Sequence, residues 1–150
     1  MISTSFQIAG IIHGSLGAAL LAILLLSVWI DTRSDESAFG SGLQIAALLQ
    51  LAQAVLGLVL HVEYNAHLRT SVFMHSEQLG WWVERKEHIA VGAVVLTWSA
   101  LAAYAVSRRV DDAQLQSTWR RAASIGARAA AGGSFLVFLV GVIVAAAMPQ

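Results

Sequence analysis

Histidine is the residue type in this chain best suited to chemistry, and it occurs five times in 150 residues. His13 lies in the first half of an apolar run, His61 closes the second run and His88 opens the third. His67 and His75 lie in the connection between those two runs. If the chain crosses a membrane four times, all five imidazoles lie toward the same face. Several imidazoles at one face, supplied by different helices, are what a haem or metal site needs.

Long apolar segments dominate the sequence. Hydrophobic residues make up 57% of the chain and charged residues 12%, about half the charged fraction of a water-soluble domain. Four runs are each long enough to span a hydrocarbon core as a helix, and none contains Asp, Glu, Lys or Arg. They cover residues 8–30, 43–62, 89–106 and 129–148. The sequence therefore predicts an all-α integral membrane protein, a four-transmembrane-helix antiparallel bundle forming a single domain over residues 1–150.

Arginine and lysine near the helix ends predict the orientation, because cytoplasmic loops of membrane proteins carry an excess of these residues. One side holds Arg33, Arg108, Arg109, Arg120, Arg121 and Arg128. The other side holds Arg69, Arg85 and Lys86. The excess predicts a multi-pass protein of a bacterial inner membrane with both termini and all histidines on the periplasmic side. The 107–128 connection is interpreted equally well as a short amphipathic helix on the inner surface or as an extension of the fourth helix.

Helical spacing places each of three histidines on a stripe of small or polar residues. Gly57 lies one turn before His61, and Gly92 lies one turn after His88. Polar groups in lipid are costly unless they are turned inward, so the stripes are predicted to face the bundle interior. Antiparallel packing brings His61 and His88 to one depth, whereas His13 lies roughly 10 Å deeper. His61 and His88 are therefore predicted to ligate a haem b iron, with His13 as the substitute and the two glycines leaving room for the macrocycle.

A second possible site lies in the connection between the second and third runs. Glu63 and His67 are four residues apart, as are Glu84 and His88. That spacing puts a carboxylate and an imidazole on one side of a helix. Together with His75, these residues predict an alternative site for an iron, copper or zinc ion. The same segment is also interpreted as a cap over the bundle or a docking surface for another subunit.

Composition excludes several functions. The chain has no Cys, which excludes disulfides, thiolate metal sites, iron–sulfur clusters and haem attached through a Cys pair. Its formal net charge is zero and it has no basic stripe, so no nucleic acid is expected as a partner. The expected partners are membrane lipid, other membrane subunits and quinone.

In layout, the chain is similar to small four-helix membrane cytochromes of the b type. The resemblance implies a subunit that carries electrons near the outer membrane face, within a larger respiratory or photosynthetic complex. Two alternatives remain: a cofactor-free accessory subunit of a membrane complex, and an outward-facing metal-binding protein that uses His and Glu. Taken together, the sequence favours an electron-transfer or accessory subunit over a stand-alone enzyme.

Overall fold

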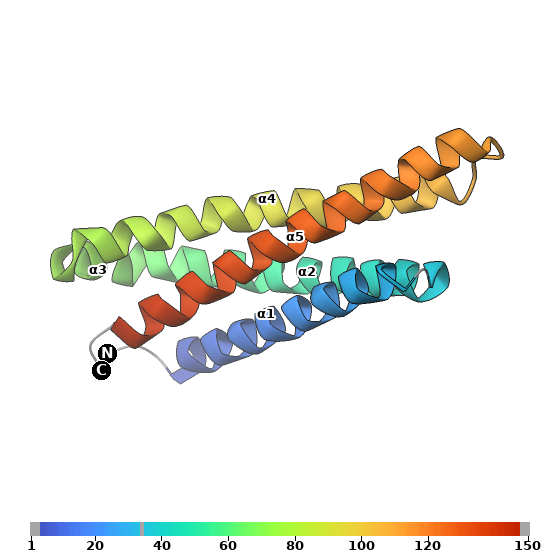
Figure 1. The fold of residues 1–150 in the computed structure, drawn as a ribbon. Coiled ribbons are helices and arrows are strands. Elements are labelled where there is room, and N and C mark those ends of the chain that lie inside the picture. Colours follow the sequence, from blue (N-terminus) through green and yellow to red (C-terminus); the bar gives the residue numbers. More distant parts are fainter. Residues whose placement is uncertain (1–3, 34, 148–150) are drawn as a thin grey trace.

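Long helices make up most of the structure, a computed structural model that describes residues 4–33 and 35–147. Its main helices are α1 (Thr4–Asp31), α2 (Glu36–Glu63), α4 (Glu77–Ser107) and α5 (Ala113–Ala147), shown in Figure 1. A π-helical turn, η1 (Tyr64–Leu68), and a short helix, α3 (Arg69–His75), connect α2 to α4. Within the described residues, four helices are long and apolar enough to cross a membrane. The chain is therefore an all-α, multi-pass membrane protein, as the sequence predicts.

The two ends of the bundle differ in composition. The short connections from α1 to α2 and from α4 to α5 lie at one end (Figure 1), and they carry Arg33, Arg108 and Arg109. We call this the arginine end. The turn η1 and helix α3 lie at the opposite end, with the start of α1 and the end of α5. We call this the histidine end, because the antiparallel arrangement brings all five histidines into this half of the bundle.

Capping side chains start three of the helices, well outside the apolar runs. Asp35, Ser76 and Asp112 each accept a hydrogen bond from the N–H three residues later, at distances of 2.8 to 3.3 Å. Such a contact satisfies one of the free N–H groups of a first helical turn. The predicted starts at residues 43 and 89 are therefore too late, since hydropathy marks the apolar part of a helix and not its end.

The 107–128 connection is mostly helical and continuous with the fourth crossing. Helix α5 begins at Ala113 and runs without a break to Ala147. The interpretation as an extension of the fourth helix is confirmed, and a separate surface helix does not form. The predicted end of that helix at residue 148 lies outside the residues that the structure describes.

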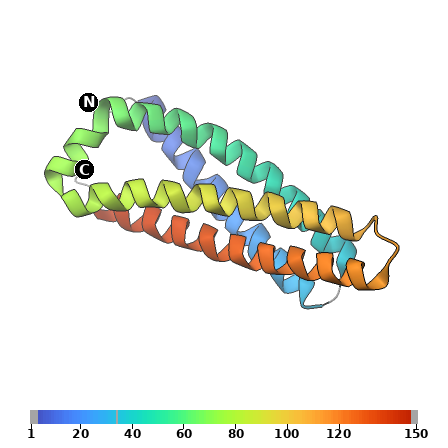
Figure 2. The ribbon, with the colours of Figure 1, turned by 90° about the horizontal axis from the view of Figure 1, so that it is seen from above.

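Small side chains form much of the core, which lets the helices approach closely. Helices α4 and α5 form the most extensive pair and lie side by side in Figure 2, while α1 packs on α2 and α5. Toward the arginine end, the buried cluster consists of Phe39, Leu43, Ala100, Ala103, Ala123 and Ala127. A second cluster joins α1, α2 and α5 and consists of Leu20, Leu24, Ala46, Ala130 and Ala131. Packing through alanine is typical of helix contacts in membranes, where small residues allow close van der Waals contact.

Candidate functional site at the histidine end

The interface between α1 and α2 holds two reciprocal contacts, each between a polar side chain and a glycine. An ideal Cβ built on Gly57 would lie 3.1 Å from Cε1 of His13. One built on Gly17 would lie 2.7 Å from Nε2 of Gln53. His13 lies one turn before Gly17 on α1, and Gln53 lies one turn before Gly57 on α2. Because the two helices are antiparallel, His13 meets Gly57 and Gln53 meets Gly17. The prediction that these two stripes face the bundle interior is confirmed, and the glycines make room for the imidazole and the amide.

Two polar groups in this region have unused hydrogen-bonding capacity. His13 is half-buried, and its Nδ1 has no partner among the residues described. Gln50 is 3% exposed, and its Oε1 likewise has no partner in the described part of the chain. Unpaired polar atoms are costly inside a membrane protein. This region therefore holds two buried polar atoms that are unpaired among the described residues.

Both ring nitrogens of His61 are engaged in hydrogen bonds with side chains. The amide nitrogen of Asn65 donates to Nε2 of His61 at 2.7 Å, which assigns the ring proton to Nδ1. That Nδ1 donates to Oε1 of Glu87, on α4, at 2.8 Å. His61 thus links α2 to α4, and in this conformation it has no nitrogen available for a metal.

On α4, the residue that contacts α2 is Glu87, which binds His61. His88 follows Glu87 in the sequence and therefore lies about 100° away around the helix, on a different face. His88 is exposed, and its Nδ1 donates to the backbone oxygen of Glu84 at 2.8 Å. Its ring proton is therefore held on Nδ1, and Nε2 is the basic nitrogen. The prediction that His88 points into the bundle is wrong.

Gly92, one turn after His88, is exposed as well. An ideal Cβ there meets no described heavy atom within 4 Å. The physical reason is that α4 carries small residues on more than one face. The side chains that face the interior are Val83, Ala93, Thr97, Ala100, Ala103 and Ser107. The stripe of His88 and Gly92 was therefore the wrong choice for the inward face of α4.

A haem between His61 and His88 does not fit this arrangement. Two axial imidazoles must each present a nitrogen to one iron from opposite sides of the macrocycle. The nitrogens of His61 are bound elsewhere, and His88 lies on another face of α4. The predicted substitute, His13, packs directly against Gly57, so that glycine leaves no gap for a macrocycle. Haem binding by the chain stays a prediction.

The predicted metal ligands of the 63–87 connection are mostly dispersed. Glu63 Oε2 lies 3.6 Å from His67 Nε2, on exposed side chains. Glu84 instead binds Arg69 at 2.7 Å, and His75 is exposed at the end of α3. Within the described residues, no group of three or more His, Cys, Asp or Glu side chains could hold a metal ion.

The same connection packs onto the end of the bundle. Its buried side chains, Tyr64 and Val72, form a cluster with Val83 of α4 and with Val140 and Val144 of α5. This contact agrees with the interpretation as a cap. The two neighbouring tryptophans, Trp81 and Trp82, remain 47% and 41% exposed and do not close over the histidines.

A buried ionic network at the arginine end was missed by sequence reasoning. Oδ1 of Asp31 lies 2.8 Å from Nη2 of Arg120, and these side chains are 10% and 17% exposed. Ser124 donates to Oδ2 of the same carboxylate at 2.6 Å, and Nη2 of Arg128 lies 3.5 Å from that oxygen. The Arg120 guanidinium also lies 4.1 Å from the centre of the Phe39 ring. The available signal was the spacing of the two arginines and Ser124, which are four residues apart on one helix.

No known protein family, curated protein or solved structure matches this chain. What the chain can do therefore follows from the geometry of its own side chains. At the histidine end that geometry provides hydrogen-bond donors and acceptors that join helices, and it provides one outward histidine with a defined tautomer.

Proposed function

We propose that this chain is a membrane-embedded subunit of a larger complex, in which the inward histidines hold the helices together. The observation that supports this role of the histidines is His61, whose two ring nitrogens bind Glu87 and Asn65 of the same chain. Hydrogen bonds between transmembrane helices contribute about 0.6–2 kcal/mol each. The His61–Glu87 contact is of this kind, and it joins α2 to α4.

Exposed glycines support the presence of neighbouring subunits. Ideal Cβ atoms on Gly10 and Gly14 of α1, and on Gly132 of α5, meet no described heavy atom within 4 Å. Glycine allows two helix backbones to approach closely, whereas a position that faces only lipid gains nothing from it. These open positions support the proposal that further helices pack against α1 and α5.

A b-type electron-transfer subunit is the second candidate, and His88 is the observation that favours it. Metal-binding histidines commonly donate their second ring N–H to a backbone carbonyl or carboxylate, which fixes the tautomer. His88 makes such a contact with Glu84, and it is exposed beside the open position of Gly92. In this candidate the second axial ligand comes from another subunit, and a quinone is the electron partner.

One separation tests the first candidate against the second. The complex is extracted from native membranes in mild detergent and resolved by size, with absorbance recorded before and after dithionite reduction. We expect the chain to elute as a species larger than its monomer, with Gly14→Leu shifting it to the monomer. Ile11→Leu is the control, because Ile11 is a neighbouring side chain that is 70% exposed.

In the same experiment, the absorbance shows whether the chain binds a haem. On the first candidate, no b-type bands of the intact wild-type complex depend on His88, and the chain contributes no stoichiometric iron, copper or zinc. A b-type spectrum that survives His61→Ala and is lost in His88→Ala replaces the first candidate with the second. Loss of the bands in both variants restores the His61/His88 pair. A wild-type chain that elutes as a monomer overturns the subunit proposal.

The finer localisation is also part of the proposal: a bacterial inner membrane with the arginine end in the cytoplasm. The arginine excess at that end supports this orientation. Alkaline phosphatase fused after Gln150 is expected to be active, and β-galactosidase fused at the same position inactive. The opposite pair of activities would reverse the assignment of both ends.

A further inference from the structure

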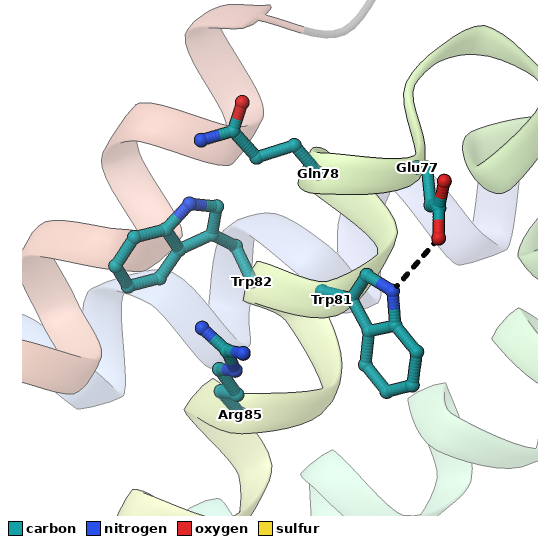
Figure 3. Close-up of a pocket in the computed structure, with 5 residues that line it drawn as sticks. All are labelled: Glu77, Gln78, Trp81, Trp82 and Arg85. Carbon is teal, nitrogen blue, oxygen red and sulfur yellow. Dashed lines mark hydrogen bonds between the residues drawn. The ribbon is translucent and has the colours of Figure 1, made fainter.

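We propose that the start of α4 binds the phosphate of a phospholipid head group. The site is a surface pocket lined by Glu77, Gln78, Trp81, Trp82 and Arg85 (Figure 3). It lies away from His61 and Glu87, and it does not depend on the subunit role proposed above.

Arg85 provides the positive charge of this pocket. None of the described carboxylates lies within ion-pair distance of its guanidinium. The acid directly before it, Glu84, is bound to Arg69 at 2.7 Å. Glu77 lies two turns away at the far rim of the pocket and accepts a hydrogen bond from Trp81 Nε1 at 3.3 Å. The Arg85 guanidinium is therefore available for an anion, and it can bind phosphate through two parallel N–H donors.

The donors around Arg85 lie on one side of the helix. Figure 3 shows the side chains of Gln78 and Trp82 extending toward α5, with the Arg85 guanidinium next to the Trp82 ring. An amide N–H and an indole N–H are hydrogen-bond donors that phosphate oxygens accept. In Figure 3 the indole nitrogen of Trp82 lies on the side of the ring toward Gln78, so these two donors border the pocket while the Arg85 guanidinium is the group that binds the phosphate.

The depth of the pocket matches the head-group layer of a bilayer. The apolar run of α4 begins at Ile89, four residues or roughly 6 Å beyond Arg85. The polar layer on each side of the hydrocarbon core is about 5–8 Å thick. Arg85 thus lies at the level of lipid phosphates, and Trp82 lies one turn farther out, where amphipathic aromatic rings are enriched.

The surface below the pocket can take the acyl chain of the same lipid. Trp82, Arg85, Ile89 and Gly92 follow one another at helical spacing on a single face of α4. Gly92 is exposed, with open space where a side chain would be. The face therefore runs from Arg85 to the apolar part of α4, which favours a lipid over a free phosphate ion as the ligand.

The test measures binding of defined probes to the purified full chain by native mass spectrometry. The probes are a short-chain phosphatidylcholine, the diacylglycerol with the same acyl chains, and inorganic phosphate. We expect phosphatidylcholine to bind, and we expect Arg85→Gln to weaken its binding by roughly tenfold, the effect of losing one charge-assisted contact. Arg85→Lys should lose less than Arg85→Gln because it keeps the charge, but it should not bind as well as the wild type because lysine cannot present two parallel donors.

The matched control is Arg109→Gln, which removes the same charge from an exposed position at the arginine end. It should leave phosphatidylcholine binding unchanged. Equal binding of diacylglycerol and phosphatidylcholine would overturn the proposal, since the phosphate would then contribute nothing. Equal losses in the Arg85→Gln and Arg109→Gln variants would also overturn it. Competition by inorganic phosphate at the affinity of the lipid would show a free-anion site in place of a lipid site.

Discussion

Replacing Asp31 with Asn is expected to destabilise the bundle by about 3–5 kcal/mol, the usual cost of leaving one member of a buried ion pair without its partner. The Asp31 carboxylate and the Arg120 guanidinium are 10% and 17% exposed and 2.8 Å apart. Nε and Nη1 of Arg120 are buried, and neither has a partner in the described part of the chain. Without the carboxylate, the described groups left to compensate its charge would be the Phe39 and Tyr104 rings. The measurement is the free energy of unfolding in mixed micelles titrated with SDS.

Two further variants show whether burial causes the loss. Glu36→Gln breaks a second ion pair at the same end, between Glu36 and Arg108, at 3.4 Å with side chains 50% and 59% exposed. Its cost should stay below about 1 kcal/mol, as for other exposed pairs. Adding Arg120→Met to Asp31→Asn removes the orphaned charge and should recover most of the stability. Equal costs for Asp31→Asn and Glu36→Gln would contradict the assignment of a buried pair.

The architecture was predictable because the physical requirement behind it is simple. A segment without charge and about 20 residues long can satisfy its backbone in lipid only as a helix. Four such segments in an antiparallel order also place all five histidines in one half of the bundle, and the structure has this arrangement. The stripes of His13 and Gln53 were predictable too, because in each of them polar and small residues share a single face.

The facing direction of His88 was not predictable from spacing alone. Helix α4 is rich in alanine, so small residues recur on its inward face as well as beside Gly92. Contacts with α2 determine which face of α4 is turned inward. Tyr104 of α4 packs on Gly40, and Glu87 of α4 binds His61. Contacts of this kind join residues far apart in the sequence, and no local pattern identifies them.

The ionic network at the arginine end shows the same limit. Arginines near helix ends are expected to lie in water or among head groups, where they mark the orientation. Arg120 instead turns toward Asp31, because α5 begins well before its apolar run and packs against the end of α1. The length of α5 was one of two interpretations at the level of sequence, and the burial of this arginine follows from it.

Replacing Gly40 with Leu is expected to cost about 2–4 kcal/mol, combining overpacking with the loss of one hydrogen bond. A Cβ on Gly40 would overlap Cε1, Cζ and the hydroxyl oxygen of Tyr104. The ring is held in place, because its hydroxyl donates to the backbone oxygen of Glu36 at 2.8 Å. It also meets the Phe39 ring edge to face, with a centroid distance of 5.8 Å. The Tyr104 ring therefore cannot move away without losing both contacts, and α2 would separate from α4. The measurement is again SDS-driven unfolding of the purified chain.

Gly132→Leu makes the same substitution at a position where an ideal Cβ meets no described atom within 4 Å. It should leave the unfolding free energy unchanged or raise it by up to about 1 kcal/mol, because leucine favours the helix more than glycine does. A loss equal to that of Gly40→Leu would mean that general disturbance of the helices, and not the Tyr104 contact, causes the effect. In native membranes the expectation differs. If a neighbouring subunit packs on α5, Gly132→Leu should release the chain from its complex while the purified monomer remains fully stable.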